Sequence, residues 1–187
     1  MKKTVKLDFG TAFKYPFNRA KGMWNILWVF LPIVGWFALL GYGVRIVKEF
    51  SKGKFDELPM MSFASDLELG FMMFLKSLPF MIAYGAILFV TALISPWLRG
   101  IVQLLLGLFV VPMLTINFFN KETVSSYFEF EILRSVFANV GDYLLTVLKS
   151  ILLGVIFFVM WIVLVGIPAG AFTQNIFMTD FYRRKIK

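Results

Sequence analysis

Four long apolar stretches constrain this chain more than any other feature of its sequence. They cover residues 23–47, 71–94, 101–119 and 143–179. A helix needs about 20 apolar residues, each rising about 1.5 Å, to cross about 30 Å of hydrocarbon. Because 59% of the 187 residues are hydrophobic, against about 45–50% in a soluble domain, a soluble core could not bury them all. The sequence therefore predicts an integral membrane protein whose membrane segments are helices.

The two middle stretches predict a spanning hairpin. Residues 71–94 and 101–119 are each long enough to cross the membrane once. Between them lies "SPWLRG" (residues 95–100), which supplies a proline turn, a tryptophan suited to the membrane interface and a single charge. We expect the two spans to pack as a tight helical hairpin around this turn.

The first stretch allows two interpretations, because Pro32 and Gly35 interrupt residues 23–47 near their middle. It either crosses the membrane once with a kink, or enters, turns at "LPIVG" and leaves on the same side. The positive-inside rule favours the second, re-entrant interpretation, because basic residues flank both ends. These residues are Lys2, Lys3, Lys6, Lys14, Arg19 and Lys21 before the stretch, and Arg45, Lys48, Lys52 and Lys54 at its end and after it.

The last stretch is too long for one span and contains "VGIPAGA", in which glycines and Pro168 would break a helix. It therefore predicts two helices. The first covers about residues 143–165, and the second is short and covers about residues 169–182. Polar residues in the second helix suggest that it packs against protein; they are Thr173, Gln174 and Asn175.

A loose internal match between the two ends of the chain suggests parallel repeats. "FKYPF" (residues 13–17) aligns with "LRSVF" (residues 133–137), and each amphipathic segment leads into an apolar stretch that ends at a basic cluster. We expect an all-α, polytopic helical membrane bundle, in which a central spanning hairpin is flanked by two halves that each contain an amphipathic helix and a hairpin. The single membrane domain (1–187) would consist of an interfacial segment (1–22), a first membrane segment (23–47), a cytoplasmic connector (48–70), the spanning hairpin (71–119), a second interfacial segment (120–142), the last helix pair (143–182) and a basic tail (183–187).

Several segments carry a resemblance to a known family: "LDFGTAFKYPF", "GYGVRIVKEF", "ELP", "LELG" and "VGDYLL". Together they resemble uncharacterised prokaryotic multi-pass membrane proteins grouped as domain of unknown function 4013. The order Gly-Tyr, basic helix, Gly and Leu-Pro in residues 41–59 is the most specific part, and the resemblance implies no reaction or substrate. The family commonly has an acidic residue soon after Leu-Pro, where this chain has "MMSFASD". Asp66 is the candidate to take that place.

The stretch from residue 41 to residue 59 has two interpretations. It is either a solvated turn along the membrane surface, with Phe50 and Phe55 in the interface, or a docking surface for a soluble partner. In the first case each lysine near anionic headgroups contributes roughly 1 kcal/mol. The candidate docking or headgroup contacts are Arg45, Lys48, Lys52, Lys54, Asp56 and Glu57.

Lys76 lies inside a predicted span, where a charge costs about 2.5–3.5 kcal/mol. We favour the interpretation that its ammonium group reaches back to the cytoplasmic headgroups. The alternative is that it lines a polar cavity opposite Glu68, Asn117 or Gln174. The candidate intramembrane polar site therefore consists of Lys76, Asn117 and Gln174.

The residue types limit the chemistry. The chain has no Cys and no His, which excludes disulfides, thiol nucleophiles, imidazole bases and ordinary zinc or haem sites. The nearest approaches to carboxylate pairs are Asp56 with Glu57 and Asp66 with Glu68, which we interpret as surface charges near a helix start. We predict no catalytic residue, no metal and no cofactor.

The net charge of +8 arises from Lys and Arg clustered beside apolar stretches, which indicates contact with anionic lipid headgroups rather than nucleic acid. The predicted function is that of a non-enzymatic accessory or scaffold subunit, in a homo- or hetero-oligomer of the cytoplasmic (inner) membrane with both termini in the cytoplasm. The alternative is a carrier or channel module for lipid or a small solute. An intramembrane enzyme would need a catalytic pair that the sequence does not offer.

Overall fold

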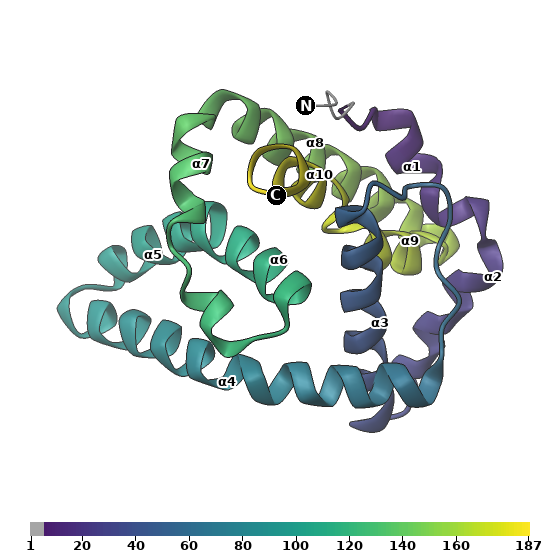
Figure 1. Cartoon of the computed structure of the whole chain (residues 1–187), viewed down its shortest axis with the longest axis horizontal. Helices are drawn as coiled ribbons and strands as arrows, with labels where there is room; N and C mark the ends of the chain where they lie inside the picture. Colours follow the sequence, from purple (N-terminus) through teal and green to yellow (C-terminus); the bar gives the residue numbers. More distant parts are fainter. Residues whose placement is uncertain (1–5) are drawn as a thin grey trace.

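The computed structural model describes residues 6–187, which form helices, turns and short loops and contain no strand. Figure 1 shows their arrangement. In chain order the elements are α1 (Phe9–Asn18), α2 (Ala20–Met23), the 3-10 helix η1 (Trp24–Phe30), α3 (Val34–Ser51), α4 (Phe63–Ile94), α5 (Pro96–Leu105), the π-helical turn η2 (Leu106–Val110), α6 (Val111–Lys121), the 3-10 helix η3 (Val124–Phe128), α7 (Ile132–Ala138), α8 (Val140–Val159), the 3-10 helix η4 (Met160–Val163), α9 (Gly166–Thr173) and α10 (Ile176–Lys185).

Three helical segments among the described residues are long and apolar enough to cross a membrane: Phe63–Ile94, Pro96–Lys121 and Val140–Val163. The prediction of an all-α fold with the character of a helical membrane bundle is confirmed. The spans begin earlier than the sequence suggested. In particular, α4 begins at Phe63, eight residues before residue 71. The more polar segment "FASDLELG" (residues 63–70) is also helical and extends α4 at its N-terminus.

The predicted central hairpin is formed by α4 and the α5–α6 segment. Ser95 has extended backbone angles and interrupts the helix, and Pro96 then occupies the first turn of α5, where its missing N–H costs nothing. Figure 1 shows this turn at the far left, away from the rest of the molecule.

The first apolar stretch breaks at its centre. Ile33 has a positive φ of 67°, and the chain reverses so that α3 packs against η1. The Trp36 Nε1 donates to the Val29 carbonyl across the turn at 2.9 Å. A Cβ on Gly35 would lie 1.9 Å from the Trp28 carbonyl oxygen, so only glycine allows this close approach. Residues 23–47 are therefore a hairpin of two packed arms, whose depth in a membrane stays a prediction.

The last apolar stretch repeats this turn. Leu164 has a positive φ of 59° and, like Ile33, lies two residues before a glycine at the start of the returning helix. The preceding amphipathic helices, α1 and α7, also end alike, at Arg19 (φ −130°) and Asn139 (φ −127°). The two ends of the chain thus share an order of elements, and parallel repeats stay a prediction. The C-terminal end differs because its returning helix breaks again at Gln174 and Asn175, where the sequence suggested one continuous helix.

Helix α3 lies between α6 and the α1–α2 segment and crosses α4 steeply (Figure 1). The crossing brings the two backbones into contact: a Cβ on Gly41 would lie 1.9 Å from the Asp66 carbonyl oxygen, and one on Gly70 would lie 1.8 Å from the Phe37 carbonyl oxygen. Other packing is aromatic. The Phe13 ring of α1 stacks on Phe157 of α8 at 5.6 Å between centroids. The amphipathic face of α1 is therefore used for packing within the chain.

Candidate functional site

The connector between α3 and α4, residues 52–62, is held in place through its backbone. Side chains from the end of α1 and from α3 each donate a hydrogen bond to one of its carbonyl oxygens, at 2.6–2.9 Å. The pairs are Asn18 with Asp56, Arg19 with Leu58, Tyr42 with Pro59, and Arg45 with Met60. We call this arrangement the carbonyl clamp. It explains why Tyr42 and Arg45 stand together in the "GYGVR" segment.

The apolar side chains of this region point inward. Phe50, Phe55 and Leu58 are buried in the core cluster, and the Phe50 and Phe55 rings stack at 5.5 Å between centroids. The Arg183 guanidinium lies 5.4 Å from the Phe55 ring centroid. The expectation that Phe50 and Phe55 enter the membrane interface is therefore wrong, because α1, α3 and α10 enclose them.

Arg45 and Asp66 form an ion pair between α3 and α4. Arg45 Nε lies 2.6 Å from Asp66 Oδ1, and Arg45 Nη2 donates to Asp66 Oδ2 at 2.7 Å. Asp66 Oδ2 also accepts from the Ser62 backbone N–H at 2.8 Å, which caps the first turn of α4. Asp66 has 0% exposure, so its interpretation as a surface charge is wrong. Glu68, the other member of that predicted pair, is exposed as expected.

The other predicted docking residues stand at the surface of the connector. Lys52, Lys54, Asp56 and Glu57 are exposed. Hydrogen bonds from Lys52 and then Lys54 lower the pKa of Glu49 below its usual value, so this carboxylate neutralises part of the basic cluster. A docking role for the exposed residues stays a prediction.

Lys48 and Lys76 both meet the end of α6. Lys48 forms an ion pair with the Glu122 carboxylate, and Lys76 Nζ donates to the Glu122 backbone carbonyl at 2.9 Å. Glu122 ends α6 in the left-handed region, with φ 55°. Lys76 therefore binds a free carbonyl at a helix C-terminus, which is an arrangement that neither sequence interpretation contained.

The three residues of the predicted intramembrane site share no partner. Asn117 is buried, accepts from the Tyr182 hydroxyl at 2.7 Å, and donates to the Ser126 carbonyl at 2.8 Å and to Glu129 at 3.1 Å. Hydrogen bonds from Lys121 and then Asn117 lower the pKa of Glu129. Asn117 thus joins α6 to α10, Lys76 caps α6, and Gln174 lies elsewhere, at the cavity described below.

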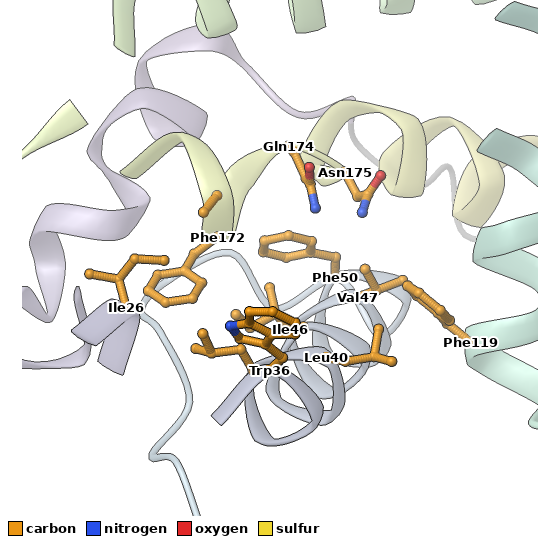
Figure 2. A pocket seen from close by; sticks show the side chains of 13 residues that line it. Ile26, Trp36, Leu40, Ile46, Val47, Phe50, Phe119, Phe172, Gln174 and Asn175 are labelled. Carbon is orange, nitrogen blue, oxygen red and sulfur yellow. The ribbon is translucent and has the colours of Figure 1, made fainter. Parts of the chain in front are cut away.

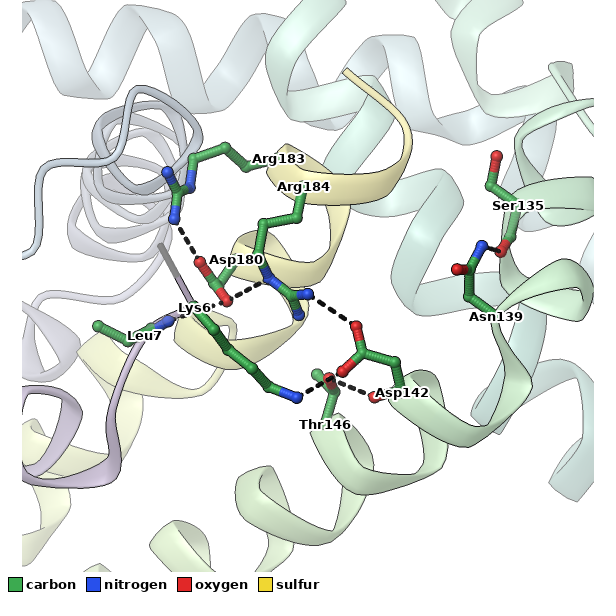
Figure 3. A network of polar contacts seen from close by, with 9 residues as sticks. All are labelled: Lys6, Leu7, Ser135, Asn139, Asp142, Thr146, Asp180, Arg183 and Arg184. Carbon is green, nitrogen blue, oxygen red and sulfur yellow. Dashed lines mark hydrogen bonds and ion pairs between the residues drawn. The ribbon is translucent and has the colours of Figure 1, made fainter. Parts of the chain in front are cut away.

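A polar network joins the two ends of the described chain (Figure 3). Buried Asp180 of α10 accepts from Arg183 at 2.6 Å, from Arg184 at 2.8 Å and from the Leu7 backbone N–H at 3.3 Å. Arg184 also binds Asp142 of α8 at 2.7 Å, and Asp142 pairs in turn with Lys6. Burial opposes the charge of Arg184, but its hydrogen bonds to Asp142 and Asp180 raise its pKa.

This network was not predicted from the sequence. The spacing of Asp180 with Arg183 and Arg184 is the helical i, i+3 and i, i+4 spacing that often gives ion pairs, so this part could have been found. The link from Asp142 to Arg184 and Lys6 depends on the fold. The network can hold the N-terminal segment, α8 and α10 together, and each of its carboxylates has a cationic partner.

A cavity of about 280 Å³ lies along one face of α3. Figure 2 shows its lining side chains, with Gln174 and Asn175 from the α9–α10 junction directed into it. The face of α3 carries Trp36, Leu40, Gly43, Val47 and Phe50, and Phe119 of α6 and Phe172 of α9 complete the apolar walls. We call this cavity the α3 groove.

Within residues 6–187, no three His, Cys, Asp or Glu side chains are grouped so as to hold a metal ion. The structure provides three features that could serve a function. They are a connector held by hydrogen bonds, a polar network that joins three segments, and an apolar groove with two amides at one end.

Comparison with known proteins gives one family. The model of the family described as "Protein of unknown function (DUF4013)" matches residues 25–166. No curated protein and no solved structure matches the chain. The matched residues include α3, the connector, α4 and all of α8.

Proposed function

Because the chain belongs to the DUF4013 family of proteins of unknown function, its role must be argued from its own surfaces, and we propose a non-enzymatic accessory or scaffold subunit of a membrane complex. The three apolar helices indicate a membrane protein. The proposed partners are membrane lipids, including anionic ones, and other membrane subunits or further copies of this chain. Nucleic acid is not a proposed partner.

The observation that carries this proposal is the free surface of α4. Among the 18 consecutive residues that make up the most apolar part of α4, none is buried. In the other two candidate spans, 28% and 22% of the corresponding residues are buried. Gly85 and the neighbouring Ala86 are small and exposed on α4, and a Cβ on Gly85 would meet nothing within 4 Å. Close approach of a second helix at such small residues is common in membranes.

We expect Gly85→Ile to weaken association through α4, because the added side chain separates two closely approaching helix backbones. The wild-type chain should show a species larger than one chain in mild detergent, by crosslinking and native mass spectrometry. The variant should lose about tenfold in association constant, or about 1.4 kcal/mol. Gly154→Ile on α8 is the matched control, because Gly154 also has nothing within 4 Å. Equal loss in both variants would contradict an interface on α4.

A second candidate function, a carrier or channel module for lipid or a small solute, is favoured by the α3 groove. The same preparations separate the two functions. A chain that stays monomeric and moves a solute into liposomes would support the carrier function and contradict the scaffold function.

We further propose that the protein lies in the cytoplasmic membrane with its charged segments and both termini on the cytoplasmic side. Ion pairs support a common location for these segments. Lys48 before the connector meets Glu122, and Lys6 near the N-terminus and Arg184 near the C-terminus both meet Asp142. Segments that bind one another in this way cannot lie on opposite sides of a bilayer.

Cysteine labelling tests this topology, because the chain has no native cysteine. Single cysteines at Lys52, Lys121 and Lys185 should resist an impermeant thiol reagent in intact cells, and one at Ser95 should react. A cysteine at Lys3, which lies outside the described residues, reports on the N-terminus. Labelling at Lys3 together with Ser95 would rule out the re-entrant placement of residues 23–47.

A further inference from the structure

The α3 groove has the form of a site for one hydrocarbon chain. Its α3 residues repeat at helical spacing from Trp36 to Phe50, fourteen residues apart, so the groove follows α3 for about 21 Å. One leaflet of a bilayer contains about 15 Å of hydrocarbon. The groove is thus long enough to receive a lipid chain along most of its length. Gly43 contributes no side chain at its middle, where a Cβ would meet nothing within 4 Å.

The two ends of the groove differ. Trp36 is 56% exposed, so the groove is open at this end, whereas Val47 and Phe50 are buried at the other. Figure 2 shows the Gln174 and Asn175 amides close to Phe50 and Val47. Gln174 is exposed and Asn175 is partly buried, so the polar groups stand where this end of the groove meets the surface. Among the hydrogen bonds within residues 6–187, none involves either side-chain amide. The two amides point into the groove from its surface end, and their N–H donors are available for a ligand.

We propose that the α3 groove binds one hydrocarbon chain of a membrane glycerolipid. The chain lies along Leu40 and Gly43 toward Trp36, and the oxygen atoms that join the chain to glycerol accept hydrogen bonds from the Gln174 and Asn175 amides. The lipid headgroup then lies at the end of α3 that carries Lys48 and the other basic residues. This orientation agrees with the proposed cytoplasmic location of those residues, because headgroups lie at the membrane surface.

A helix from a second chain fits the groove less well. A helix with its side chains is about 10–12 Å across, and its backbone carbonyls are already bonded within the helix, so its backbone would bring no free acceptor to the two amides. A single lipid chain is narrow and brings free acceptor oxygens. The inference does not depend on whether the protein is a scaffold or a carrier, because it concerns one chain and one lipid.

The test is to measure retained lipid after purification in mild detergent, by native mass spectrometry and by lipid extraction. The delipidated chain is then titrated with dioleoyl phosphatidylglycerol in mixed micelles. Gly43→Leu places a side chain in the groove and should weaken binding at least about tenfold. Gly154→Leu, at an equally open position on α8, should bind as the wild type does. Gln174→Leu removes one donor and should weaken binding by about fivefold, as expected for one hydrogen bond.

Several outcomes would overturn the proposal. A wild-type chain that binds no phosphatidylglycerol, or a folded Gly43→Leu chain that binds it normally, excludes a chain in the groove. Equal loss in Gly154→Leu means that the retained lipid only coats the apolar surface. If Gly43→Leu does not fold, Leu40→Trp fills the same space from the next turn of α3. Crosslinks from position 43 to a second copy, with no lipid bound, would identify a protein helix as the occupant.

Discussion

Replacing Gly41 by alanine should destabilise the protein by about 3 kcal/mol or prevent folding. The new Cβ would lie 1.9 Å from the Asp66 carbonyl oxygen and 2.8 Å from the Gly70 backbone nitrogen, and neither is a flexible side chain that can move aside. Helices α3 and α4 would have to separate, which empties part of the core between them. Overpacking of this kind typically costs 1–3 kcal/mol, and occasionally more, so we expect the upper end of this range where backbone atoms must shift. Unfolding in a denaturing detergent, followed by circular dichroism, measures the loss.

Gly43→Ala is the matched control for Gly41→Ala. It lies two residues further along α3, where a Cβ meets nothing within 4 Å, so alanine introduces no clash. Because alanine stabilises a helix relative to glycine, this variant should be unchanged or more stable by up to about 1 kcal/mol. If the two variants behaved alike, the backbone contact between α3 and α4 would not be present in the membrane.

The second large effect is expected for Asp66→Ala, with a loss of about 3 kcal/mol in stability. Removal of one member of a buried ion pair typically costs 3–5 kcal/mol, because the remaining charge keeps its desolvation cost without a partner. The lower value applies here, since the Arg45 side chain is 30% exposed and water can reach part of it. The variant also removes the cap on the Ser62 N–H. Thermal unfolding monitored by size-exclusion chromatography in detergent provides the measurement.

Glu68→Ala gives the reference for Asp66→Ala, because Glu68 is exposed two residues later on the same helix. Its effect should stay within about 0.5 kcal/mol. A double-mutant cycle with Arg45→Ala then isolates the pair. If the two single losses simply add, Arg45 and Asp66 act independently and the clamp does not depend on their contact.

The overall class of this fold follows from the sequence, and its contacts do not. Long apolar stretches predict helices in a membrane because only helices satisfy their own backbone there, and glycine with proline at "LPIVG" and "VGIPAGA" predicts where they break. The positive φ angles of Ile33 and Leu164 could not be predicted, because residues other than glycine rarely adopt them, and a β-branched residue such as isoleucine least of all. These backbone angles bring the glycine two residues later, Gly35 or Gly166, close to the backbone of the preceding arm.

The candidate site shows the same division. The basic residues near α3 are visible in the sequence, and their exposure at Lys52 and Lys54 agrees with a surface interpretation. The burial of Asp66 and Phe55 is not visible, because it depends on which helices enclose the connector. Amphipathic spacing cannot distinguish a phenylalanine that faces lipid from one that faces a neighbouring helix, since both environments are apolar in a membrane protein. The partners of Lys76 and Asn117 likewise depend on where α6 ends.

The carbonyl clamp holds the connector by its backbone carbonyl oxygens. The path of the connector therefore does not depend on which side chains it carries. Asn18, Arg19, Tyr42 and Arg45 bind oxygens that every amino acid possesses, so substitution at Asp56, Glu57 or Met60 leaves these bonds available. Antibody loops on a rigid scaffold use a comparable division between frame and variable surface. The exposed face of this connector could therefore exchange its charges, and with them its binding preference, while the protein beneath it keeps the same shape.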